Sequence, residues 1–270
     1  MVRLTHPFPS ALDGLVSGGV ALVAGAATDT ALRVGIAMTA LQLGIGVVND
    51  VVDAPRDAGR KLGKPIPAGL VSPELAMVLA AAAFALGFLL SAPGGALLIA
   101  LAVVVIAIGL AYDLRLKGTP WSWLPFAVGI PVLPVFGWAG ATGRFPPMFA
   151  VLVPAAVAAG VALAIANSLV DVGRDREAAV SSVTLALGEG RAQALNTGLL
   201  VGVAGAGALS CWVVGGGAPA TAGTVGIGCL LVLASWLARA PDPGRRELAW
   251  RIQAIGLGAL AMLWIGAIPR

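Results

Sequence analysis

The sequence predicts an all-α, polytopic membrane protein with nine transmembrane helices. Of its 270 residues, 59% are hydrophobic and only 11% are charged, and the mean hydropathy is +0.95. A soluble domain carries about 25% charged residues, so the lipid bilayer is the expected solvent. Similar acidic motifs follow the second and sixth apolar runs. This recurrence predicts two four-helix pseudo-repeats followed by one further helix.

Each predicted helix is an apolar run of about 20 residues, the length that spans a bilayer. The runs lie at 11–27, 31–50, 71–91, 94–112, 122–140, 148–170, 192–214, 217–238 and 248–268. The remaining sequence leaves no room for a soluble domain. We therefore expect a single transmembrane domain over 1–270, with motif loops at about 49–70, 112–121 and 171–191.

The connections between the runs alternate in character. Short, bland segments such as SAPGG (91–95) and GGGAP (215–219) join the third run to the fourth and the seventh to the eighth. The connections after the even-numbered runs are basic, and their side of the membrane holds 14 of the 17 Lys and Arg residues. The positive-inside rule then predicts a multi-pass protein of the cell (inner) membrane with a cytoplasmic N-terminus. An odd number of spans places the C-terminus outside.

Four prolines fall along the fifth run and its beginning, and they allow two interpretations. Pro125, Pro131 and Pro134 lie inside the run, and Pro120 lies two residues before it. Membrane helices tolerate such residues as kinks where neighbouring helices pack. A bent helix could also widen an internal cavity.

The first acidic motif, NDVVDAPRD (49–57), closes the second run. Asp50, Asp53 and Asp57 are spaced i, i+3 and i+7, so a continuing helix would align them on one face, beside Asn49. Pro55 should kink a helix at this point and makes the alignment of Asp57 the least secure.

The second motif, NSLVDVGRD (167–175), closes the sixth run. Asp171 and Asp175 are spaced i, i+4 and again share a helix face, with Asn167 one turn earlier. Like charges at such spacings repel, and charges near the bilayer core are costly. Such a motif could be a solvated loop whose acids balance its arginines. Two motifs on the same side favour a bound cation, and oxygen ligands without His or Cys favour Mg²⁺.

Basic residues accompany the acidic motifs. They lie in AGRKLGKPIPAG (58–69), in YDLRLKGTPWSW (112–123) and in REAAVSSVTLALGEGR (176–191). Carboxylates, Mg²⁺ and Lys or Arg together are suited to hold a diphosphate. The chain has no P-loop or Gly-rich nucleotide fingerprint in a strand–turn–helix context. A membrane-embedded site therefore predicts a lipid diphosphate, with its head among the loops and its tail among the helices.

At these motifs the chain resembles the UbiA superfamily of intramembrane prenyltransferases. NDVVDAPRD matches the pattern NDxxDxxxD at each fixed position, and DVGRD (171–175) matches DxxxD. KPIPAG (64–69), YDLRLK (112–117) and TLALG (184–188) are similar to further family segments. The motifs are individually loose, but together and in this order they are specific and cover nearly the whole chain.

The resemblance implies an Mg²⁺-dependent prenyltransferase that faces the cytoplasm. Its metal ligands would be Asn49, Asp50, Asp53, Asp171 and Asp175. Lys117, Arg60, Lys64 and Arg176 would neutralise the leaving diphosphate. Tyr112 would lie near the reactive carbon of an allylic carbocation, which a lipophilic acceptor captures. Asn167 would assist substrate binding, and Asp57 would either assist it or orient a basic residue.

Two departures from the family pattern leave the subfamily open. The second motif carries Asn167 and Ser168 where many members are more acidic, and Lys64 stands where Arg is usual. His6, the only histidine, is not expected to bind metal, and a role near the acceptor pocket stays open.

Two other functions remain as alternatives. A terpene cyclase of the same fold would trap the cation with the substrate's own double bonds. A divalent-cation transporter would be expected to show ionisable groups at mid-membrane, where this chain is nearly all apolar. Quinone precursors, haem, chlorophyllide and glycerol ethers are all acceptors in proteins of this type. We expect the lipid bilayer as a partner, and no nucleic acid.

Overall fold

A computed structural model of the chain describes residues 7–57, 63–213 and 216–267. In these ranges all regular elements are helical, which confirms the predicted all-α class. The chain forms two compact units. Unit 1 comprises Met1–Arg115 and Val132–Arg144, and unit 2 comprises Leu116–Pro131 and Phe145–Arg270. The expectation of a single domain stays a prediction.

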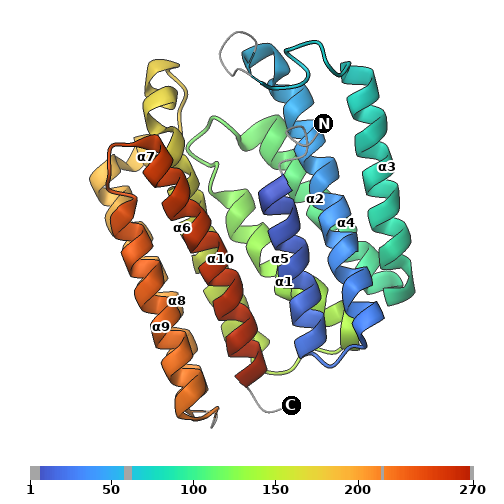
Figure 1. Ribbon diagram of the computed structural model, residues 1–270, viewed down its shortest axis with the longest axis vertical. Coiled ribbons are helices and arrows are strands. Elements are labelled where there is room, and N and C mark those ends of the chain that lie inside the picture. The colour runs from blue at the N-terminus through green and yellow to red at the C-terminus, as the bar shows by residue number, and fades with distance from the viewer. Residues whose placement is uncertain (1–6, 58–62, 214–215, 268–270) are drawn as a thin grey trace. The chain divides into compact units, whose positions relative to one another are not determined.

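Unit 1 is built around α2, which packs against α1, α3 and α4 (Figure 1). Its helices are α1 (Pro7–Val23), α2 (Thr28–Asp57), α3 (Pro73–Ser91), α4 (Gly95–Ala111) and the later part of α5 (Leu124–Thr142). Glycines bring α1 and α2 close together, because a Cβ at Gly35 would lie only 2.9 Å from the Gly14 carbonyl oxygen. Such small-residue contacts are typical of helices that pack within a bilayer.

Unit 2 has a core to which all its long helices contribute. Its elements are the early part of α5 and α6 (Phe149–Glu177), α7 (Val183–Leu187), α8 (Glu189–Val213), α9 (Gly217–Leu237) and α10 (Pro243–Ala267). Leu163, Leu200, Leu231 and Leu260 form the buried centre, and Phe126 of α5 packs against it. Because these helices share one core, the end of α6 and the beginnings of α8 and α10 belong to one packed unit.

A buried amide pair links three helices of unit 2. Asn196 of α8 donates from Nδ2 to Gln253 Oε1 of α10 at 3.0 Å and to the Ala162 carbonyl oxygen of α6 at 2.8 Å. Gln253 donates back to Asn196 Oδ1 at 3.3 Å. Both side chains are almost completely buried, so each amide depends on the other for its hydrogen bonds.

Replacing Asn196 by leucine should therefore destabilise unit 2 by about 1 kcal/mol, because Gln253 is left buried without its partner. Unfolding in a detergent titration, followed by circular dichroism, measures this loss. The double replacement Asn196→Leu and Gln253→Leu should recover most of it. Leu195→Ala, on an exposed neighbour, is the control. A double variant less stable than the single one would contradict a reciprocal pair.

Seven helical segments of the described chain are long and apolar enough to cross a membrane. One of them, Pro73–Leu116, is a 44-residue stretch that contains both α3 and α4. The 3-10 turn η2 (Ala92–Gly94) separates these two helices, and Gly95 follows with φ 77°, a conformation that favours glycine. The 17-residue α1 is a shorter apolar helix. The multi-pass prediction is supported, while the nine spans, the repeat and the orientation stay predictions.

Candidate functional site

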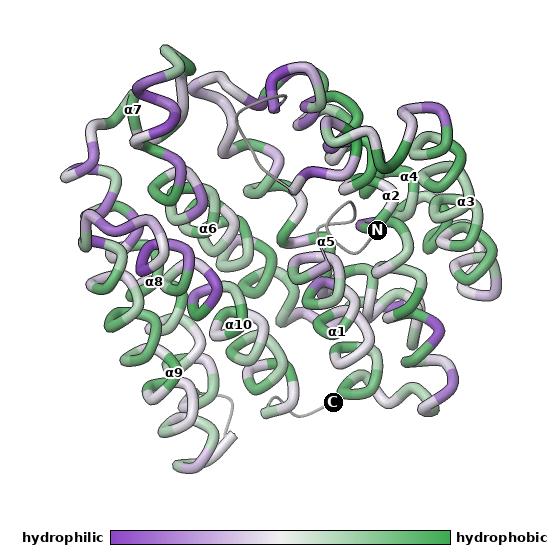
Figure 2. Tube along the Cα trace, turned by 45° about the horizontal axis from the view of Figure 1, so that its top comes forward, coloured by the Kyte–Doolittle hydropathy of each residue, from purple (hydrophilic) through white to green (hydrophobic). Residues whose placement is uncertain are grey.

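The first acidic motif lies on the last turns of α2. The helix continues through Pro55 to Asp57, so the whole motif 49–57 is helical, where a loop was expected from about residue 49. Asp57 is only 6% exposed and lies on the same buried face as Asp50 and Asp53. The alignment of Asp57, which Pro55 made the least secure of the three, is thus kept, and the kink at Pro55 stays a prediction. Hydrophilic residues gather at this end of α2, beyond its apolar length (Figure 2).

The segment KPIPAG is held against the same end of α2. Its turn is closed by backbone hydrogen bonds from Leu70 N to Pro65 O and from Gly69 N to Ile66 O, both 2.9 Å. Ile66 is buried in a cluster with Val47 and Val48 of α2. This anchoring brings Lys64 to α2, where its Nζ forms an ion pair with Asp50 Oδ1.

A second segment reaches α2 from the end of α4. Residues Tyr112–Leu116 form a π-helical turn, η3, a wide turn that is frequent at functional sites. The turn buries Asp113, whose Oδ1 accepts a hydrogen bond from Asn49 Nδ2 at 2.5 Å. This bond fixes the orientation of the Asn49 amide, so that its oxygen lies opposite the Asp113 contact and can act as a ligand.

Asp113 is a candidate site residue that the motifs did not reveal. It lies 64 residues from its partner in sequence, and no spacing rule links them. The signal available was an aspartate that follows Tyr112 directly at the end of a wholly apolar helix. Tyr112 itself is half-buried on the same turn. Lys117 is also half-buried and belongs to unit 2. Arg60 and His6 lie outside the described residues.

The second acidic motif lies on the last turns of α6 and is more open to solvent than the first. Asp171 and Asp175 are half-buried, as is Asn167. Asp171 forms an ion pair with Arg174, one turn further along the helix. The two motifs belong to different units, so the metal site that both were predicted to share stays a prediction.

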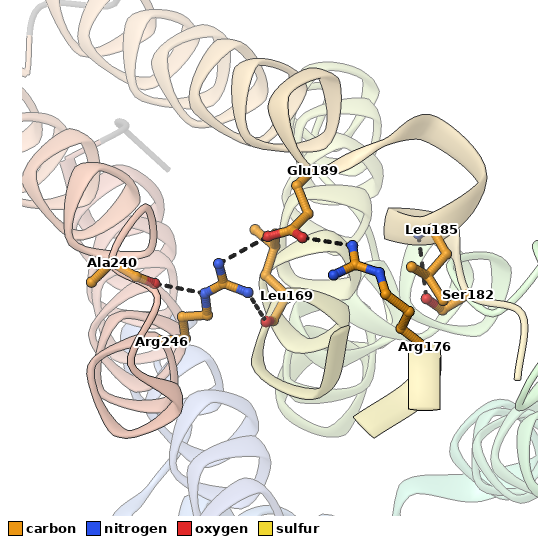
Figure 3. Close-up of polar contacts among 7 residues, drawn as sticks. All are labelled: Leu169, Arg176, Ser182, Leu185, Glu189, Ala240 and Arg246. Carbon is orange, nitrogen blue, oxygen red and sulfur yellow. Dashed lines mark hydrogen bonds and ion pairs between the residues drawn. The ribbon is translucent and has the colours of Figure 1, made fainter. Parts of the chain in front are cut away.

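The segment after α6 folds back against it through α7. Ser182 caps α7 by accepting a hydrogen bond from Leu185 N at 3.5 Å (Figure 3). The backbone N–H of Thr184 donates to Ser168 Oγ on α6 at 3.3 Å. Ser168 is one of the departures from the family pattern, and here it holds the TLALG segment beside the motif.

The charged side chains around α6 include two that sequence reasoning left without a role, Glu189 and Arg246. Arg176, which was expected to bind substrate, donates to Glu189 Oε1 at 2.9 Å. The other carboxylate oxygen of Glu189 accepts from Arg246 at 2.9 Å. Hydrophilic residues gather around α7 and the beginnings of α8 and α10 (Figure 2).

The donor chemistry of the first motif fits a hard divalent cation. The motif supplies three buried carboxylates and one amide, Asp50, Asp53, Asp57 and Asn49, and η3 adds the buried carboxylate of Asp113. Within residues 7–57, 63–213 and 216–267, no three His, Cys, Asp or Glu side chains form a ready-made metal cage. Mg²⁺ does not need one, because it usually keeps several waters and binds one or two carboxylates plus substrate phosphates.

Comparison with known families decides the class of protein. The model of the UbiA prenyltransferase family matches residues 14–264. The chain belongs to the UbiA prenyltransferase family. The resemblance inferred from the motifs is thereby confirmed, and with it the enzyme class. The match also spans both acidic motifs and all the basic segments between them.

Similar proteins of known sequence carry one name, digeranylgeranylglyceryl phosphate synthase. The protein from Methanopyrus kandleri is 29% identical over 75% of this chain and 75% of its own length. That from Natronomonas pharaonis is 28% identical over 74% and 73%, respectively. The protein from Methanoculleus marisnigri is 32% identical, but the match spans only 44% of this chain and 43% of that protein.

Solved structures show the same fold. A UbiA homologue from Aeropyrum pernix K1 aligns over 98% of both chains with a TM-score of 0.77 and 20% identity. A UbiA homologue from Archaeoglobus fulgidus, solved with GPP and Mg²⁺, aligns over 98% of both chains with a TM-score of 0.71 and 15% identity. The predicted UbiA-like fold is therefore confirmed.

Proposed function

We propose that the protein is an Mg²⁺-dependent intramembrane prenyltransferase that transfers a prenyl group from a prenyl diphosphate to a lipophilic acceptor. The observation that carries this proposal is the row of buried carboxylates at the end of α2, with Lys64 beside Asp50 and Asp113 beside Asn49. Buried acids of one charge are costly in a membrane helix unless they serve a cation. The prenyl diphosphate and Mg²⁺ of the Archaeoglobus homologue support this assignment.

Residues of both motifs would hold the metal. Asn49, Asp50 and Asp53 of the first motif and Asp171 and Asp175 of the second are its proposed ligands. Asp57 and Asn167 would assist from the neighbouring turns. When bound, Mg²⁺ would supply positive charge that binds the diphosphate oxygens and stabilises the charge that develops on them.

The basic residues complete the proposed diphosphate site. Lys64, Lys117, Arg60 and Arg176 would neutralise the leaving group. The bond between the allylic carbon and the diphosphate oxygen breaks, and the electron pair leaves with the diphosphate. The acceptor then donates an electron pair to the allylic cation and loses a proton. Stabilisation of the departing charge would be the main catalytic term, and apolar helix surfaces exclude water from the cation.

The names of the relatives narrow the acceptor class that should be tested first. Digeranylgeranylglyceryl phosphate is a glyceryl phosphate with two geranylgeranyl groups. We therefore propose a glyceryl phosphate that already carries one prenyl chain as the first acceptor, ahead of aromatic compounds. The active site would face the cytoplasm, on the side predicted to hold most of the Lys and Arg residues.

Incubation of the purified protein with Mg²⁺ and a panel of prenyl diphosphates tests the proposal. Each donor is supplied with and without prenylated glyceryl phosphate or an aromatic acceptor, and products are identified by mass. We expect Mg²⁺-dependent release of diphosphate together with a prenylated acceptor. An acceptor-free hydrocarbon would instead identify a cyclase. No diphosphate release from any donor would refute the proposed reaction.

Asp113 should tune the metal site through Asn49. Asp113→Leu removes the acceptor that orients the Asn49 amide while keeping a similar side-chain size. Loss of such an outer contact typically weakens metal binding roughly 10- to 100-fold. The Mg²⁺ concentration for half-maximal turnover should rise accordingly. Leu114→Ala, on the exposed neighbour in the same turn, should leave it unchanged. An unaltered Mg²⁺ dependence in Asp113→Leu would assign Asp113 a purely structural role.

A further inference from the structure

A buried arginine ties the end of α6 to α8 and α10. The Arg246 side chain is only 9% exposed. Its guanidinium donates to the Ala240 carbonyl oxygen at 2.7 Å, the Leu169 carbonyl oxygen at 3.0 Å and Glu189 Oε2 at 2.9 Å (Figure 3). Leu169 precedes Asp171 by two residues. Arg246 therefore holds the α6 backbone at the second motif and, at the same time, the first residue of α8.

Glu189 is fixed from two sides. One carboxylate oxygen accepts from Arg246 and the other accepts from Arg176, each at 2.9 Å (Figure 3). Gly188 adopts φ 79° just before it, and this left-handed conformation directs the chain from α7 into α8 without strain only because the residue is glycine. The carboxylate is thus a bridge between one buried guanidinium and one exposed guanidinium.

The exposed guanidinium of this bridge, Arg176, is placed where it can reach a ligand. Arg176 directly follows Asp175, and its side chain is 63% exposed. Exposed ion pairs contribute little to stability. The ion pair between Arg176 and Glu189 is therefore better explained by a role in ligand binding than by a role in folding. A guanidinium has five N–H donors, and a bond to Glu189 leaves enough of them to bind phosphate oxygens. Restraining the side chain beforehand reduces the entropy that a diphosphate must remove on binding.

We propose that Glu189 and Arg246 are positioning residues that hold Arg176 ready for the diphosphate group. The proposal rests on the function proposed above and extends it to two residues outside the family motifs. Arg246 fixes Glu189, Glu189 restrains Arg176, and Arg176 contacts the ligand. Arg176, Glu189 and Arg246 together carry one net positive charge, so Arg176 keeps cationic character for an anion although it is bound to a carboxylate.

A double-mutant cycle between Glu189→Gln and Arg176→Met tests this order of action. The readout is the Kd of inorganic diphosphate with Mg²⁺, measured by calorimetry on the purified protein. Each single variant should raise the Kd roughly tenfold, because one charge-assisted contact is lost or loosened. Since Glu189 acts through Arg176, the double variant should bind within about twofold of Arg176→Met. Multiplied effects, near a hundredfold, would overturn the proposal.

Arg246 is tested by its conservative replacement. Arg246→Lys keeps the charge but cannot reproduce three directed hydrogen bonds, so it should weaken diphosphate binding as much as Glu189→Gln does. Normal diphosphate affinity in Arg246→Lys would contradict the role given to the three hydrogen bonds of the Arg246 guanidinium. Glu247→Gln breaks the exposed pair with Arg251 on the same helix and is the matched control, expected to bind normally. If Arg246→Lys does not fold, the double-mutant cycle of Glu189→Gln and Arg176→Met still tests whether Glu189 acts through Arg176.

Failure of this inference can be separated from failure of the proposed function. The protein could bind diphosphate and show non-additive effects of Glu189→Gln and Arg176→Met, yet turn over no prenyl diphosphate. That result would refute the transferase reaction and leave the positioning role intact. Normal turnover with independent effects in the cycle would refute the positioning role alone. A wild-type protein that does not bind diphosphate with Mg²⁺ would refute both.

Discussion

Replacing Asp50 by asparagine is expected to reduce turnover of a prenyl diphosphate by roughly a thousandfold, the loss typical of removing a principal charge-stabilising group. The carboxylate is 3% exposed and paired with Lys64, and asparagine offers a neutral oxygen in nearly the same volume. The measurement is release of inorganic diphosphate at saturating Mg²⁺. The size-exclusion elution profile of the variant in detergent, compared with that of the wild type, checks that it is folded.

Asp29→Asn is the matched control for this experiment. Asp29 lies in the first turn of the same helix, exposed at the opposite end, where its Oδ1 accepts from Thr30 N at 2.7 Å. It loses the same charge by the same substitution, so turnover should stay within about twofold of wild type. Near-normal activity in Asp50→Asn, or an equal loss in Asp29→Asn, would exclude a specific role for Asp50.

Asp171→Asn should cause a loss of similar size if the second motif supplies metal ligands. The side chain is 43% exposed, so its replacement should not disturb the packing of unit 2. Turnover measured across a Mg²⁺ titration should show a higher half-saturating concentration as well as a lower maximum. Glu177→Gln, exposed at the end of the same helix, should behave like wild type.

Combining the two substitutions tests whether the motifs serve one site. Residues that act as a unit give strongly non-additive losses, so Asp50→Asn with Asp171→Asn should be little worse than either alone. Two independent metal sites would instead multiply their losses. This comparison addresses the pairing of the motifs directly, because one lies in each unit.

Periodicity predicted the local structure of the first motif because its information is local. Spacings of i, i+3 and i+7 correctly place Asp50, Asp53 and Asp57 on one buried face of α2. Pro55 made the position of Asp57 the hardest of the three to predict, and the helix nevertheless continues through Pro55 to Asp57 despite the one backbone bond that proline cannot make. Neighbouring helices and side chains can compensate for such a loss in membrane proteins.

Contacts between distant segments could not be predicted in the same way. Asn49 meets Asp113 because α4 returns to the end of α2 and finishes in a π-helical turn. Arg246 meets Leu169 and Glu189 because α10 packs against α6 and α8. No single-sequence pattern encodes which helices become neighbours. In the sequence, Arg246 therefore counts only as one of the basic residues that predict topology, and Asp113 only as an aspartate at the end of an apolar run.

The ion pair between Lys64 and Asp50 would make metal and substrate binding interdependent. A divalent cation that takes Asp50 must compete with an ammonium group that already occupies it, which weakens metal binding in the absence of substrate. Once displaced, the ammonium group is available to a diphosphate. Each ligand would thus lower the cost of binding the other, and thermodynamic linkage makes that benefit reciprocal. The resting enzyme would carry an internal cation in place of the metal, and the site would load as a single cooperative step.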